Sequence, residues 1–209
     1  MAYVETKTLR DEAAVDERLA EIGLDRKKLL KVRDIAIGSA ANATPFHAAN
    51  AAGTFSYQDG TWALRNEFVD GSNWTVDRTD GVEAIKCEAR KTRVAFCNVD
   101  VAANDFHSPH PRSKKGSGAE RASGLGPDLF GGDLPQFSRP PQKGWALYYL
   151  MVDEAGAAEL SRPRVQNGTF ASQIERIYLP EDKQTEVQAN RYVPEAPADN
   201  FDPLVVRKK

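Results

Sequence analysis

The residues with the clearest chemical potential lie in a basic, glycine-rich segment near the middle of the chain. Four cations surround the triplet Gly116-Ser117-Gly118: Arg112, Lys114, Lys115 and Arg121. Glycines let backbone N–H groups come close to an anion, and lysine and arginine neutralise its charge. The order of residues matches neither the P-loop nor the dinucleotide-binding fingerprint. The composition therefore favours a non-enzymatic binding protein that contacts phosphate groups, of nucleic acid in the first instance, through residues 107–126.

A second group of residues, just upstream, could bind a metal ion. Asp100 ends a segment that resembles a buried strand, and Asp105, His107 and His110 follow within the next ten residues. One carboxylate and two imidazoles can hold a divalent metal and leave positions open for water. The spacing matches no known zinc signature, however, and both histidines could simply face solvent. A metal-assisted hydrolase that uses Asp100, His107 and His110 is therefore the alternative function; otherwise we expect no cofactor.

The cysteines give weaker support for catalysis and say more about location. Cys97 lies in an apolar segment, where a thiol behaves as a small hydrophobic group. Cys87 is close to Lys86 and Arg90, which would lower its pKa if it were exposed. With only two cysteines, no Cys-x-x-Cys pair, no signal-peptide pattern and no long apolar run, we expect a soluble, cytoplasmic protein without a disulfide or a membrane partner. The sequence leaves open whether the protein is an enzyme, and it does not predict the oligomeric state.

Composition limits the kind of nucleic-acid binding that is possible. The chain has 209 residues, 28% of them charged, and a net charge of −2. This balance excludes a uniformly basic coat protein but not a local basic patch. Length and composition predict one α+β domain over residues 1–180 and a polar, proline-spaced tail over 181–209.

The N-terminal region predicts two amphipathic helices that position the rest of the domain. The first spans 8–22 and ends at Gly23, and the second spans 26–41 after the capping residue Asp25. Their charged outer faces could also dock a protein. Together with the apolar tail residues Phe201, Leu204, Val205 and Val206, they support a third hypothesis, a protein–protein adaptor.

The remaining elements predict a mostly antiparallel sheet crossed by a long loop. Asp59-Gly60 is a typical two-residue hairpin turn, which would pair Tyr57 with Trp62 and Phe55 with Leu64. Residues 82–91 favour a helix slightly over a second hairpin that pairs Val76 with Ile85 and Trp74 with Cys87. The patterns indicate a loop at 42–53, strands at 92–101, 145–152 and 157–162, a strand or short helix at 168–179, and an irregular loop over 102–144.

Overall fold

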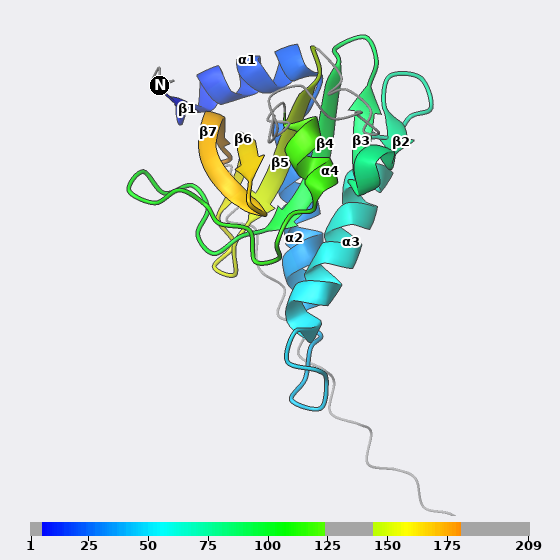
Figure 1. The fold of residues 1–209 in the computed structure, drawn as a ribbon, viewed down its shortest axis with the longest axis vertical. Coiled ribbons are helices and arrows are strands. Elements are labelled where there is room, and N and C mark those ends of the chain that lie inside the picture. The colour runs from blue at the N-terminus through cyan, green and yellow to red at the C-terminus, as the bar shows by residue number, and fades with distance from the viewer. Residues whose placement is uncertain (1–5, 124–143, 181–209) are drawn as a thin grey trace, which may run out of the picture.

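In the computed structural model, a seven-stranded sheet organises the residues that the structure describes, 6–123 and 144–180 (Figure 1). From edge to edge its strands are β1 (Lys7–Leu9), β7 (Thr169–Tyr178), β6 (Ala158–Gln166), β5 (Ala146–Val152), β4 (Thr92–Asn98), β3 (Ala84–Cys87) and β2 (Thr75–Asp77). Neighbouring strands are antiparallel except at β1–β7 and β4–β5. The sheet is therefore mostly antiparallel, as predicted, whereas the predicted tail 181–209 lies outside the described residues.

Three helices precede most of the sheet in sequence: α1 (Glu12–Ile22), α2 (Arg26–Ala40) and α3 (Ala51–Phe68). The first two confirm the predicted helical pair. The side chains of Asp11 and Asp25 accept backbone N–H groups at the starts of α1 and α2, and Gly23 ends α1 with a φ of 84°. Figure 1 shows α2 and α3 side by side, extending beyond the sheet. Among the described residues, no helix combines the length and apolar character that crossing a bilayer requires.

The sheet has an apolar core on each face. Alternate residues of a strand point to opposite faces, so Phe96 of β4 packs with the three long helices while Cys97 packs on the other side. That second face is covered by a short helix, α4 (Ser117–Ala122), and by neighbouring loop segments. Cys87 belongs to the first core and Cys97 to the second. Both thiols are free and buried, which agrees with the absence of a disulfide.

The predicted hairpin at Asp59-Gly60 is wrong, because both residues lie inside α3. Gly60 serves a different purpose there: a Cβ atom at this position would lie only 2.6 Å from the ring of Phe96. The glycine thus allows α3 to pack closely on β4. Asp59 accepts a hydrogen bond from the hydroxyl of Ser39 on α2, and Tyr57 and Trp62 are both partly exposed on the helix.

The helix favoured for residues 82–91 is also wrong, and the hairpin alternative is correct. β2 and β3 are antiparallel with Val76 opposite Ile85, as that alternative predicted, although Trp74 precedes β2 and does not pair with Cys87. The turn between the strands contains Asp80 and Gly81, both with positive φ. Ile85 and Cys87 are almost completely buried. Their burial outweighs the weak strand propensity of the residues around them.

Several predicted boundaries also change. Residues 7–9 form β1, so α1 begins at Glu12, and the loop after α2 ends at Asn50. β4 stops at Asn98, β6 continues to Gln166, and the segment 168–179 is a strand. The region 102–144, predicted to be irregular, contains α4, and its residues 124–143 lie outside those described.

Candidate functional site

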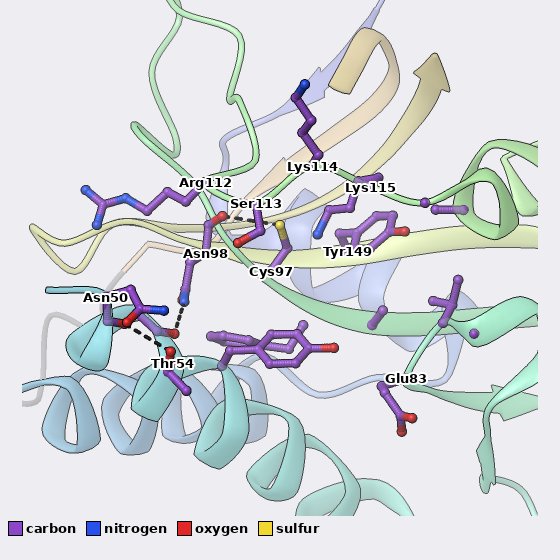
Figure 2. Close-up of a pocket in the computed structure, with 18 of the residues that line it drawn as sticks. Asn50, Thr54, Glu83, Cys97, Asn98, Arg112, Ser113, Lys114, Lys115 and Tyr149 are labelled. Carbon is purple, nitrogen blue, oxygen red and sulfur yellow. Dashed lines mark hydrogen bonds between the residues drawn. The ribbon is translucent and has the colours of Figure 1, made fainter. Parts of the chain in front are cut away.

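A cleft of about 540 Å³ lies beside the end of β4 (Figure 2). The first turns of α3 form one wall and residues 112–119 form the opposite wall. Residues 80–83 close one end, and Tyr149 of β5 contributes to the lining. The predicted phosphate-binding segment and the sheet thus meet at one concave surface, which is the usual form of a ligand site.

The cleft exists because β3 is shorter than β4. β3 pairs only as far as Ala95, so Phe96 and Cys97 have a strand partner in β5 alone among the described residues. Asn98 then fixes both walls: its side chain accepts a hydrogen bond from Ser56 and donates one to the carbonyl of Gly53, 2.9 Å away. Its own carbonyl accepts the backbone N–H of Arg112. Asn98 therefore has a positioning role in the cleft wall.

The cations predicted to bind phosphate are not equivalent. Arg112 forms an ion pair with Glu154, and Arg121 forms a pair of 3.4 Å with Asp80. Neither Lys114 nor Lys115 has an ion-pair partner among the described residues. Figure 2 shows Lys115 lying against Tyr149 while Lys114 points away from the cleft. Lys115 is thus the predicted cation best placed to meet a ligand in the cleft.

Lys115 is held over an aromatic surface. Its ammonium group lies 5.1 Å from the ring centre of Tyr149 and 5.8 Å from that of Phe170, within the range of cation–π contacts. Its backbone N–H donates a 2.8 Å hydrogen bond to the carbonyl of Gly168, which ties the segment to the turn between β6 and β7. These contacts hold the ammonium group beside the cleft. Because no carboxylate among the described residues pairs with it, the ammonium group is free to bind a ligand anion.

The acidic residues around the cleft are already paired. A hydrogen bond from Arg65 lowers the pKa of Glu83, and one from Arg112 lowers the pKa of Glu154. Asp80 contacts Arg121. Each carboxylate thus has a cation of its own, which leaves the charge of Lys115 uncompensated.

The glycines of the segment do not form the anion cradle that the sequence suggested. Gly116 precedes α4 as its capping residue, and Ser117 is exposed at the first position of that helix. Gly118 is buried against the backbone carbonyl of Asp80, where an added Cβ would clash. Gly116 lines the cleft, but Gly118 serves the packing of α4 on the turn before β3.

Cys97 lines the cleft but is not a plausible nucleophile. Burial raises the pKa of its thiol, and the nearby charge of Lys115 offsets this only in part. The protonated thiol is unreactive, since the thiolate is the nucleophilic form. The sequence interpretation of Cys97 as a small hydrophobic group is therefore confirmed.

Tyr149 is a lining residue for which the sequence favours core packing over contact with a ligand, because its neighbours are apolar; the structure places it in both the core and the cleft lining. Its side chain is buried, yet its hydroxyl has no hydrogen-bond partner among the described residues. A buried polar group without a partner is rare and calls for an explanation such as a ligand or ordered water. No feature of the sequence distinguishes Tyr149 from its neighbour Tyr148.

Removal of the hydroxyl should destabilise the protein at Tyr148 but not at its neighbour Tyr149. Tyr148 donates a 2.7 Å hydrogen bond to Glu175, so Tyr148→Phe is expected to lower the free energy of unfolding by about 1.5–3 kcal/mol. Tyr149→Phe removes a group without a partner and should leave the ligand-free protein at least as stable as wild type. Urea denaturation of the two variants tests this, and a larger loss for Tyr149→Phe would contradict it.

The predicted metal-binding residues do converge, at a place outside the cleft lining. One ligand atom from each of Asp100, His107 and His110 lies within 4.8 Å of the other two. Asp105, the other acidic residue of this sequence group, lies elsewhere and pairs with Arg10. The third histidine, His47, lies in the loop between α2 and α3.

The carboxylate of Asp100 is kept charged by its hydrogen bonds. Partial burial favours the neutral form, but the backbone N–H of His110, the side chain of His107 and the N–H of Val101 together lower its pKa to about 2. Asp100 therefore accepts hydrogen bonds from backbone N–H groups and still presents an oxygen to both histidines.

No family model, curated protein or solved structure matches this chain. The geometry of the two sites is therefore what supports a function for this protein.

Proposed function

We propose that this protein binds a phosphate-bearing ligand, with a nucleic acid strand as the favoured source, in the cleft between α3 and residues 112–119. The observation that carries the proposal is the ammonium group of Lys115, which lies in the cleft with no ion-pair partner among the described residues while the nearby carboxylates are paired. An anion is the ligand that compensates such a charge, and lysine is a regular binder of phosphate groups.

The rest of the lining favours a ligand that also carries a flat ring. Tyr57 borders the cleft and is 36% exposed, so its ring is free to stack on a base. Tyr149 supplies a hydroxyl without a partner. A phosphate beside a base is the chemistry of a nucleotide, whether free or within a strand. Lys114, exposed next to Lys115, offers a second cation for a neighbouring phosphate of a strand.

The test measures anisotropy of labelled single-stranded DNA, single-stranded RNA and duplex DNA over a salt series, with unlabelled AMP and inorganic phosphate as competitors. If Lys114 and Lys115 each contact one phosphate of a single strand, the slope of log K against log salt is expected to be about −1.4. Tighter binding of an oligonucleotide than of AMP supports a nucleic acid as the source of the bound phosphate. Competition by AMP at equal nucleotide concentration supports the free nucleotide instead. If no probe binds at low salt, the proposal is overturned.

The other predicted functions have less support. The hydrolase hypothesis would need a substrate at Asp100, His107 and His110, which do not line the cleft. The adaptor hypothesis used the outer faces of the helices and the tail segment at Phe201, and the tail lies outside the described residues. A protein partner and a cytoplasmic location stay predictions from the sequence.

A further inference from the structure

We infer that Asp100, His107 and His110 form a binding site for a divalent transition metal, with Zn²⁺ as the reference ion. This site is separate from the proposed phosphate cleft, and it stands or falls independently of ligand binding there. The three donor atoms lie close together, and the fold holds the loop that carries them.

The donor atoms have a spacing close to that of metal ligands. Oδ2 of Asp100 lies 2.8 Å from Nε2 of His107 and 3.3 Å from Nδ1 of His110. Ligand atoms at about 2.0–2.1 Å from a tetrahedral zinc ion are about 3.4 Å apart, so the side chains would rotate to bring all three donor atoms, now within 4.8 Å of one another, to this spacing. A metal would replace the hydrogen that Asp100 and His107 now share. The side chains are 39–57% exposed, which leaves room for water or another ligand at the remaining position.

Both ends of the loop are fixed by backbone pairing. Val99 and Pro111 form an antiparallel bridge, and the N–H of Asp100 donates a 3.1 Å hydrogen bond to the carbonyl of His110. The N–H of His110 returns a 2.8 Å bond to Oδ1 of Asp100. The carboxylate and the second histidine are therefore brought together by main-chain geometry and do not depend on chance contact of exposed side chains.

The middle of the loop is tied to the sheet by a buried ion pair. Arg176 of β7 pairs with Glu159 of β6 at 2.6 Å, and both side chains are at most 6% exposed. The same guanidinium donates hydrogen bonds to the carbonyls of Asn104 and His107, at 2.9 and 3.2 Å. Glu159 accepts the N–H of Ala103 at 2.7 Å. The backbone of His107 is thus held in place from beneath, which is the support that metal ligands need.

The donor set selects the class of metal. Imidazole nitrogens suit zinc, copper, iron and nickel, whereas Mg²⁺ and Ca²⁺ prefer a shell of oxygen ligands. Two imidazoles and one carboxylate also match the composition of known zinc sites that keep one position open. We therefore expect the site to bind Zn²⁺ and not to bind Mg²⁺.

The experiment is calorimetric titration of ZnCl₂ or MgCl₂ into the full chain, without an affinity tag and after treatment with a chelator. Wild type should bind one Zn²⁺ and no Mg²⁺. The variants H107A, H110A and D100N should each bind Zn²⁺ at least about 100-fold more weakly, since disturbing groups that only orient metal ligands already has an effect of 10–100-fold. Their thermal unfolding, measured without metal, checks that they remain folded.

His47 provides the matched control. It is an exposed histidine outside the cluster, where its Nδ1 accepts the backbone N–H of Thr44 at 2.9 Å. H47A should bind Zn²⁺ as wild type does. The proposal is overturned if wild type binds no Zn²⁺, or if H107A and H110A, folded, bind it as tightly as H47A. Zinc binding with no change in oligonucleotide or AMP affinity would leave the two sites independent, as inferred here.

Discussion

Replacement of Glu159 by alanine is expected to lower the free energy of unfolding by about 3–5 kcal/mol, because it leaves the charge of Arg176 buried without a partner. Glu159 is fully buried, and its two oxygens accept hydrogen bonds from Arg176, Ser161 and the backbone of Ala103. The alanine variant loses all of these interactions at once. Because Ala103 begins the loop to His107, the variant should also bind Zn²⁺ more weakly.

An exposed ion pair that reaches the same loop at Asp105 gives the control for Glu159→Ala. Arg10 and Asp105 lie 2.6 Å apart, but their side chains are 54% and 45% exposed. Water solvates and screens such a pair, so Arg10→Ala should change the unfolding free energy by less than about 1 kcal/mol. Denaturant titration of Glu159→Ala and Arg10→Ala measures the two changes in unfolding free energy. Equal and small losses would show that the pair of Glu159 and Arg176 does not stabilise this part of the fold.

Replacement of Arg93 by methionine is expected to have an effect of similar size, about 3–5 kcal/mol, at the other end of the sheet. Arg93 and Asp77 are each 4% exposed at the side chain and lie 2.6 Å apart. Arg93 also donates a 2.8 Å hydrogen bond to the carbonyl of Thr79, at the start of the turn that closes one end of the cleft. Methionine keeps the apolar volume, so the measured loss reports on the charge and its hydrogen bonds.

The loss caused by Arg93→Met should depend on pH. Burial raises the pKa of Asp77, but hydrogen bonds from Thr79 and the charge of Arg93 outweigh it, and the folded-state pKa lies below the ordinary value. A carboxyl with a lowered pKa contributes stability above its unfolded pKa of about 4 and loses it as the pH falls through the folded value. The difference between wild type and Arg93→Met should therefore shrink below about pH 4.

Lys86 provides the comparison for Arg93→Met. It is the residue opposite Arg93 on β3, and its pair with Glu88 is partly exposed. Lys86→Met should change the unfolding free energy by less than about 1 kcal/mol at any pH. If Arg93→Met has no larger effect at neutral pH, or if its effect does not shrink in acid, this account of the buried pair is wrong.

The sequence predicts those elements whose signals are local. Asp25 and Gly23 identify the ends of helices because a cap depends on residues within one turn. The hairpin at Gly60 was predicted wrongly because the reason for that glycine is the ring of Phe96, thirty-six positions away in the chain (96 − 60). β1 was missed because three residues gain a strand conformation only from their parallel partner β7.

At the candidate sites, too, the sequence predicts what depends on neighbouring residues and not what depends on residues distant in the chain. The sequence predicted the convergence of Asp100 with two histidines because all three lie within one short loop. It could not rank the four cations around Gly116, since their partners are distant: Glu154 for Arg112 and Asp80 for Arg121. The roles of Tyr57 and Tyr149 in the cleft likewise depend on where α3 and β5 lie relative to the segment 112–119.

The most direct test of the phosphate-binding proposal is the affinity of Lys115→Met for a labelled single-stranded oligonucleotide, beside Lys31→Met. Lys31 is an equally charged residue on α2 that pairs with Glu67, away from the cleft lining. A charge-assisted contact with phosphate contributes about 1.5–3 kcal/mol, so Lys115→Met should bind roughly 10–100-fold more weakly. Its salt slope should also be smaller than that of wild type by about 0.7. Lys31→Met should match wild type in both respects. If folded Lys115→Met binds with the affinity and salt slope of Lys31→Met, the cleft is not the phosphate site.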